Sequence, residues 1–148
     1  MKNVLFGLFF VAAFVVFFRH AEKPEKEFGQ LSCQGLNRAL ALPQVLISKF
    51  GKPDHLFAPA PSRRTTATGE EYNYVRPLAT IEPTAIRLGL PVNTDYNFTD
   101  IDGLCFDSKD YDGIYVVQVT TNGSARSVSF NQDHEKLDNL STDCPDAK

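Results

Sequence analysis

The chain contains no tryptophan, a single methionine at its start and only three cysteines in 148 residues. It therefore lacks the adaptable methionine-rich surface of promiscuous binding proteins. No CxxC pair occurs, so neither a zinc-finger framework nor a thioredoxin-like redox motif is indicated. Basic charge is not in excess, because the net charge is -3 and both signs are mixed along the chain. Since nucleic-acid-binding proteins show a basic face, we predict no nucleic-acid partner.

Catalytic and cofactor motifs are also missing. His20, His55 and His134 stand outside any HxH or HExxH spacing, and no GxSxG sequence supplies a nucleophile for them. The chain has no GxGxxG sequence and no Walker-type glycine loop, which excludes the common nucleotide-binding fingerprints. We predict a protein that is not an enzyme, binds no cofactor and has no catalytic or metal-binding residues.

The aspartates between positions 100 and 112 invite comparison with a calcium-binding loop. The sequence DYDG at 110–113 matches the middle of an EF-hand loop, but the twelfth position would then be Val119, where a bidentate glutamate is required. The sequence DIDG at 100–103 fails similarly, with Lys109 at that position. Because Asp-Gly pairs are ordinary turn formers, we interpret this segment as turns.

The longest apolar run lies at the N-terminus. No charged residue occurs from Val4 to Phe18, and Arg19 ends the run. As a helix at about 1.5 Å per residue, this run would span roughly 23 Å, somewhat less than the roughly 30 Å hydrocarbon core of a bilayer. We predict an uncleaved membrane anchor over residues 1–21, with a cleaved signal peptide and a buried core helix as alternatives.

The segment after the anchor, residues 22–30, is charged and contains Pro24 and Gly29, which is typical of a linker. Basic residues flank the anchor on both sides, so their distribution does not decide its orientation. We favour export because the apolar segment begins the chain. The prediction is a single-pass inner-membrane protein whose domain, residues 31–148, faces the periplasm, and the alternative is a protein secreted after signal cleavage.

The cysteines Cys33, Cys105 and Cys144 would leave one thiol unpaired in an oxidising compartment. Three pairings are possible. We predict a disulfide between Cys105 and Cys144, because it would tie the C-terminal tail to the body of the domain. Three reduced thiols are the alternative.

The N-terminal part of the domain predicts two short helices. Leu36, Ala39 and Leu40 share one helical face. Pro43 suits the first turn of a second helix, which would end at Phe50 before a glycine that favours a C-terminal cap. Residues 54–69 are interpreted as a loop because they contain two prolines and end on a glycine.

The rest of the domain predicts strands. The sequence EYNYVR at 71–76 alternates as a strand does, and Pro77 would end it, while Thr84–Leu88 predicts a single helical turn. The clearest element is a hairpin of residues 114–121 and 124–131 around Asn122-Gly123, the preferred pair for a type I′ turn.

That turn fixes the register of the hairpin. It would pair Val117 with Val128 and Tyr115 with Phe130, and so gather apolar side chains on one face. Because this face needs cover, we predict an α+β fold in which two short N-terminal helices pack on a small antiparallel sheet of about three to four strands, preceded by the apolar anchor.

Phe57, Arg63 and Arg64 are the candidate partner-binding residues. They share the predicted loop at 54–69, and an aromatic side chain near two arginines is a composition typical of recognition loops. A solvated loop without a partner is the alternative interpretation.

The order of these features resembles the SmpA/OmlA group, the BamE-like small envelope proteins. In that family a helix pair leads through a Gly-x-Pro turn into a small antiparallel sheet. The sequence FGKPD at 50–54 is similar to the helix end and turn, residues 72–75 to the first strand, and residues 115–130 to the closing hairpin. The lipidated cysteine of the family is missing, the apolar anchor stands in its place, and residues 78–113 would be an insertion between strands.

The resemblance implies a non-enzymatic envelope protein that acts by binding another protein, in envelope assembly or maintenance. The second hypothesis is an immunity or inhibitor protein that blocks a toxin or hydrolase, because related α+β folds bind enzymes through their sheets. The third is a small cation-dependent or hydrolytic enzyme.

Overall fold

The computed structural model describes residues 11–26, 28–62, 64–66, 70–97, 114–122 and 125–145. Within these ranges the chain is an α+β protein with two helices and three small sheets. It divides into two compact units, one of residues 1–19 and 111–134 and one of residues 20–110 and 135–148.

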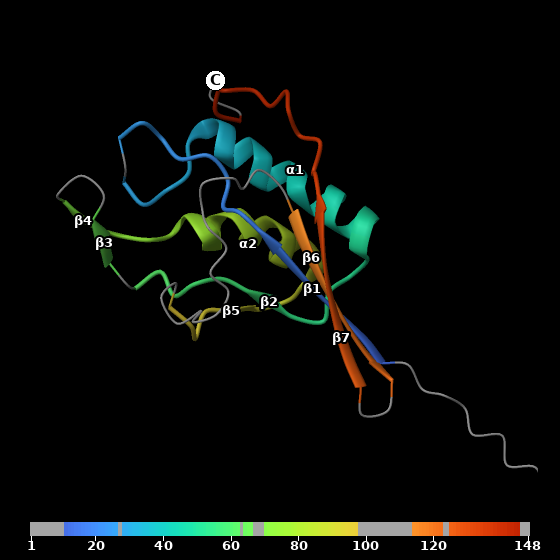
Figure 1. Ribbon diagram of the computed structural model, residues 1–148. Helices are drawn as coiled ribbons and strands as arrows, with labels where there is room; N and C mark the ends of the chain where they lie inside the picture. The colour runs from blue at the N-terminus through green and yellow to red at the C-terminus, as the bar shows by residue number, and fades with distance from the viewer. Residues whose placement is uncertain are drawn as a thin grey trace, which may run out of the picture. The chain divides into compact units, whose positions relative to one another are not determined.

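The first unit is a three-stranded antiparallel sheet (Figure 1). Its strands are β1 (Val11–Phe18), β6 (Ile114–Asn122) and β7 (Ala125–Asp133), and β6 lies in the centre. The pairing of β6 with β7 confirms the predicted antiparallel hairpin near the C-terminus.

The register of this hairpin differs from the prediction. Val117 pairs with Phe130 and Val119 with Val128, a displacement of two residues. The last pair, Asn122 with Ala125, leaves positions 123 and 124 as the connection, and these lie outside the described residues. Their sequence, Gly-Ser, begins with the glycine that a type II′ connection requires, so it competes with Asn-Gly for the turn. Because the displacement is an even number, each residue keeps the face that the prediction gave it.

The second half of the predicted anchor forms strand β1. Val15 pairs with Val117 and Phe18 with Ile114, in continuous antiparallel register. Residues 1–10 lie outside the described residues, and neither described helix is both long and apolar enough to cross a membrane. The anchor and the periplasmic location therefore remain predictions.

The second unit is built around α1 (Cys33–Phe50). Ser32 caps its N-terminus, since the Ser32 hydroxyl accepts a hydrogen bond from the Gly35 amide at 3.1 Å. Gly51 ends it as predicted: its φ is 78°, and its N–H donates to the Ile47 carbonyl at 2.9 Å. A positive φ at this position is why glycine suits it.

The prediction of two short helices separated at Pro43 is wrong, because α1 is one continuous helix of 18 residues. Proline inside a helix removes one backbone hydrogen bond and crowds the preceding turn. The compensating gain is burial: Ala39, Leu42, Pro43 and Leu46 form one buried stripe, which an interrupted helix would not align.

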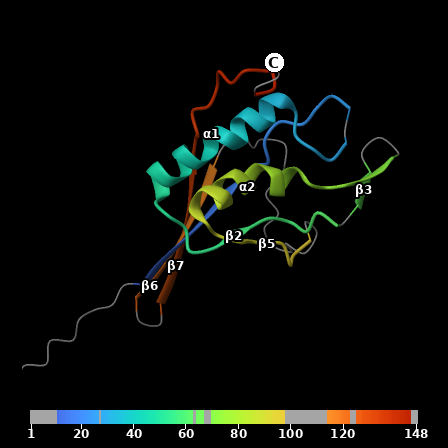
Figure 2. The same ribbon diagram turned by 180° about the vertical axis from the view of Figure 1, so that it is seen from behind.

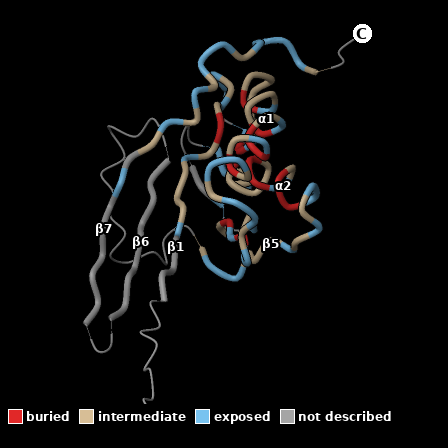
Figure 3. The backbone as a smooth tube through the Cα atoms, turned by 90° about the vertical axis from the view of Figure 1, so that its right-hand side faces the viewer, coloured by how far each residue is buried: buried red, intermediate tan, exposed pale blue. Residues whose placement is uncertain are grey.

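The second helix is α2 (Arg76–Leu88), which packs against α1 (Figures 2 and 3). The prediction of a strand ending at Arg76 and a single helical turn at Thr84–Leu88 is wrong here, because one helix occupies this sequence. Pro77 lies in its first turn, where a missing N–H has no cost, rather than after a strand. Thr80, Ile81 and Ala85 are buried on one side, and this shared face maintains the helix through an internal proline.

Two pairs of short strands complete the second unit. β2 (Leu56–Phe57) pairs in parallel with β5 (Val92–Asn93), and β3 (Arg64–Thr66) pairs antiparallel with β4 (Glu71–Asn73). The predicted loop at 54–69 therefore contains two strands, and the predicted strand at 71–76 is shorter than expected.

The C-terminal tail is fastened to the start of α1. Cys144 forms a disulfide with Cys33, with a Cα–Cα distance of 4.5 Å. The side-chain amide of Asn37, one turn along the helix, donates to the backbone carbonyls of Ser141 and Asp143 at 2.8 Å each. The predicted pairing of Cys144 with Cys105 is thus wrong: the tail lies along the first turns of α1, where Cys33 is the adjacent thiol. Cys105 lies outside the described residues.

The predicted linker at 22–30 is docked on the helices. The Glu22 carbonyl accepts from the Ser32 amide at 2.8 Å, and the buried Ala21 donates its N–H to the Thr80 hydroxyl at 3.0 Å. Gly35 permits the close approach, because a Cβ at this position would collide with the Glu22 backbone.

Candidate functional site

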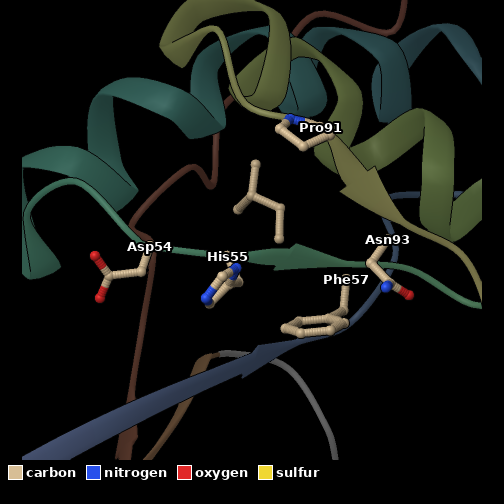
Figure 4. A pocket seen from close by; sticks show the side chains of 6 residues that line it. Asp54, His55, Phe57, Pro91 and Asn93 are labelled. Atoms are coloured by element: carbon tan, nitrogen blue, oxygen red, sulfur yellow. The ribbon is translucent and has the colours of Figure 1, made fainter.

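A pocket opens beside the parallel strands β2 and β5 (Figure 4). Its volume is about 250 Å³, and its lining consists of Asp54, His55, Leu56, Phe57, Pro91 and Asn93. Figure 4 shows Pro91 across the pocket from His55 and Phe57.

The two helix ends position the walls of the pocket. The chain leaves α1 at Gly51 and enters the 54–57 segment, and it leaves α2 at Gly89 and enters the 91–93 segment. Gly89 has a φ of 63° and ψ of 35°, a left-handed cap that reverses the chain. Because α1 and α2 pack against each other and each ends at a glycine cap, the segments that follow them lie side by side and run parallel.

Backbone hydrogen bonds continue this pairing beyond the short strands. The Ala58 amide donates to the Asn93 carbonyl at 3.0 Å, and the Ala60 amide donates to the Tyr96 carbonyl at 2.7 Å. The segment that carries Phe57 is therefore fixed on both sides of that residue.

Strand alternation separates the roles of neighbouring residues. Leu56 is buried, whereas Phe57 is 61% exposed on the opposite face. The His55 ring lies 6.3 Å from the Phe57 ring, with the planes inclined by 51°. An exposed aromatic side chain beside an imidazole is a surface suited to contact with another molecule.

The polar groups of the pocket are held by local contacts. The side-chain amide of Asn93 donates to the Asp95 carboxylate at 2.8 Å. The side-chain oxygen of Asn93 accepts a hydrogen bond from the backbone N–H of Asp95 at 3.0 Å. In the part of the chain that the structure describes, no group of three His, Cys, Asp or Glu side chains is arranged to hold a metal ion.

Two of the predicted partner-binding residues, Phe57 and Arg64, belong to different strand pairs of the second unit. Phe57 lies at the pocket, whereas Arg64 belongs to the β3–β4 pair, where it bonds Glu71 through a 3.0 Å ion pair and a 2.8 Å hydrogen bond to the carbonyl. Arg63 lies outside the described residues. Sequence reasoning missed Pro91 and Asn93, because no local pattern indicates a parallel pairing between segments this far apart.

A charge cluster fastens loop and tail to α1. Arg38 donates from Nε to the two Glu22 carboxylate oxygens at 2.8 and 3.0 Å, and it also forms an ion pair with Glu135. The hydrogen bond to Glu22, joined by the charges of both glutamates, raises the pKa of Arg38 above its ordinary value despite partial burial. This cluster is structural, because all three side chains are committed to each other.

Comparison of the chain with known protein families, with curated proteins and with solved structures finds no match.

Proposed function

We propose that the protein is a non-enzymatic binding module, tethered to the inner membrane by its N-terminal segment and facing the periplasm, that recognises another protein. The observation that carries the proposal is the exposed Phe57 at the rim of the β2–β5 pocket. Aromatic side chains, phenylalanine among them, are enriched at protein interfaces relative to the rest of the surface.

The pocket is small. Its volume is about 250 Å³, near the lower end of the roughly 300–1,000 Å³ that small-molecule sites usually occupy. Such a volume suits one side chain inserted by a partner, with Phe57 packing beside it.

The disulfide supports the proposed compartment. A bond between Cys33 and Cys144 joins residues 111 positions apart. Disulfides of this kind persist in the periplasm and outside the cell but are rare in the reducing cytosol. The resemblance to BamE-like envelope proteins is in accord with this location.

The proposal is tested by comparing two variants in one co-purification experiment. Phe57→Ala removes the aromatic side chain at the pocket. Ile86→Ala is the matched control, because Ile86 is 75% exposed on α2 and is not among the pocket residues. Each full-length protein is purified from detergent-solubilised envelope, and bound proteins are quantified by mass spectrometry.

We expect the specific partners of the parent protein to be lost with Phe57→Ala and retained with Ile86→Ala. Partners from envelope assembly would support the role implied by the family resemblance, and a toxin or hydrolase would support the inhibitor hypothesis. Equal recovery of every partner with both variants contradicts the proposed binding site.

A further inference from the structure

Arg76 is a buried cation at the first residue of α2. It is 5% exposed, and its guanidinium Nε and Nη1 have no hydrogen-bond partner. Among the residues whose burial the structure describes, it is the only charged side chain in the interior. Buried arginines are almost always paired, because an uncompensated charge in the interior is strongly destabilising.

Two aromatic rings hold the guanidinium in place. Its central carbon lies 5.0 Å from the centre of the Tyr74 ring and 5.9 Å from that of the Tyr72 ring. Cation–π contacts stabilise a charge, but they leave the N–H donors without acceptors. The rings therefore account for the position of Arg76 and not for its unused hydrogen-bonding capacity.

The backbone around Arg76 is fixed independently of its side chain. The Arg76 amide donates to the Gly29 carbonyl at 2.9 Å, and the Arg76 carbonyl accepts from the Thr80 hydroxyl at 2.8 Å. Gly29 has a φ of 75° and lies so close to Asn73 that a Cβ would collide with the Asn73 carbonyl. The start of α2 is thus held by contacts that do not depend on the guanidinium.

No described carboxylate compensates the charge. Glu22 and Glu135 are bound by Arg38, and Glu71 is bound by Arg64. The N-terminus of α2 adds to the positive potential, because helix dipoles are positive at this end and Val75 provides no side-chain cap. A guanidinium with unused donors on the first residue of a helix attracts oxygen anions through its own N–H groups and through the positive end of the helix dipole.

We propose that the Arg76 guanidinium, held at the start of α2, binds a small oxyanion, a phosphate or carboxylate group. Nε–H and Nη1–H donate to the anion beside the rings of Tyr72 and Tyr74. The bound anion neutralises the guanidinium, so binding stabilises the folded domain.

The first test is titration of the full-length, detergent-purified protein with sodium phosphate and, separately, sodium acetate at constant ionic strength. Sodium chloride serves as the salt control. We expect phosphate or acetate, but not chloride, to raise the melting temperature and to shift the Arg76 Nε–H resonance in a ¹⁵N-labelled sample. If neither anion moves that resonance, the proposal is overturned.

The second test compares affinities for the effective anion by calorimetry. Arg76→Gln removes the charge, and Arg64→Gln is the control at an exposed arginine that already has a partner. We expect at least about tenfold weaker binding for Arg76→Gln, equivalent to losing about 1.4 kcal/mol, and unchanged binding for Arg64→Gln. Equal effects of the two variants contradict the proposal. If Arg76→Gln does not fold, the resonance shift in the parent protein still decides between the two outcomes.

Discussion

Leu42 and Leu40 are the same residue type on one helix, two positions apart, in opposite environments. Leu42 is 1% exposed, whereas Leu40 is 51% exposed. We expect Leu42→Ala to lower the free energy of unfolding by about 3 kcal/mol, since it removes buried methyl groups and leaves a cavity. Leu40→Ala should change it by no more than about 0.5 kcal/mol. Urea denaturation followed by circular dichroism measures both, and equal losses would contradict the assigned buried face of α1.

Arg38 offers a test of the charge cluster. Charge-assisted hydrogen bonds contribute about 1.5–3 kcal/mol, and partial exposure of the glutamates reduces this. We expect Arg38→Met to lower the unfolding free energy by about 1–2 kcal/mol, against about 0.5 kcal/mol or less for Arg64→Met at its exposed ion pair. Denaturant midpoints of the two variants provide the comparison.

The raised pKa of Arg38 also fixes the sign of its pH dependence. A cation whose pKa is higher in the folded state contributes stability that is fully present below its unfolded value. That contribution is lost only as the pH rises through the folded pKa, which lies above the ordinary range of arginine. We therefore expect the titration of Arg38 to leave the unfolding free energy independent of pH around neutrality. The difference in unfolding free energy between Arg38→Met and the parent protein should then be the same at each pH in that range, as far as Arg38 itself is concerned.

At the scale of elements, Gly35 decides how closely α1 approaches the loop before it. Alanine usually stabilises a helix relative to glycine by roughly 0.5–1 kcal/mol. Here a Cβ would meet the Glu22 backbone, which cannot rotate away as a side chain would. We expect Gly35→Ala to destabilise the domain by about 1–3 kcal/mol through overpacking. The exposed Gln44→Ala on the same helix is the control, and a higher melting temperature for Gly35→Ala would show that the loop does not lie where we place it.

The hairpin shows how far local pattern determines an element. Alternation in residues 114–131 predicted both strands and their antiparallel pairing, which the structure confirms. Alternation has a period of two, so it cannot distinguish registers that differ by two residues. Two overlapping turn sequences, Asn-Gly and Gly-Ser, were available in the same stretch, and the register follows the second.

The helices show the opposite case. Pro43 and Pro83 each disfavour a helix interior locally, and Pro77 is interpreted from the sequence as the end of a strand. These three prolines led the prediction to break α1 and to miss most of α2. Both helices nevertheless continue, because each buries one face against the other. Burial over several turns outweighs one missing hydrogen bond, and that comparison is only possible once the partner helix is known.

At the scale of the whole molecule, the disulfide joins the tail to the first helix. We expect Cys33→Ser with Cys144→Ser to lower the unfolding free energy by about 2–4 kcal/mol, since the closed loop is long. Cys105→Ser should leave the disulfide intact. Peptide mapping without reduction identifies the bond, and thermal unfolding measures its contribution. A peptide that links Cys105 to Cys144 would contradict the structure and restore the pairing expected from sequence.

Strand β1 and the predicted anchor require the same residues in two different environments. Val15→Cys with Val117→Cys places thiols at paired positions of β1 and β6. In full-length protein that also carries Cys105→Ser, we expect a disulfide between these two thiols in molecules whose N-terminal segment is not inserted in the bilayer. We expect it to be absent from carbonate-resistant membranes, because an embedded segment cannot pair with β6. A cross-link in the embedded fraction would exclude the anchor over these residues.

Local sequence patterns were sufficient for the α+β class, the C-terminal hairpin and the end of α1 at Gly51, and they contain no familiar catalytic motif. These features depend on neighbours along the chain: alternation, a capping glycine and fixed motif spacing. Tertiary structure alone decided the partner of Cys144, the continuity of the helices, the pocket beside β2 and β5 and the burial of Arg76. Each of these depends on contacts between segments tens of residues apart, whose free energies exceed the local preferences that a sequence pattern records.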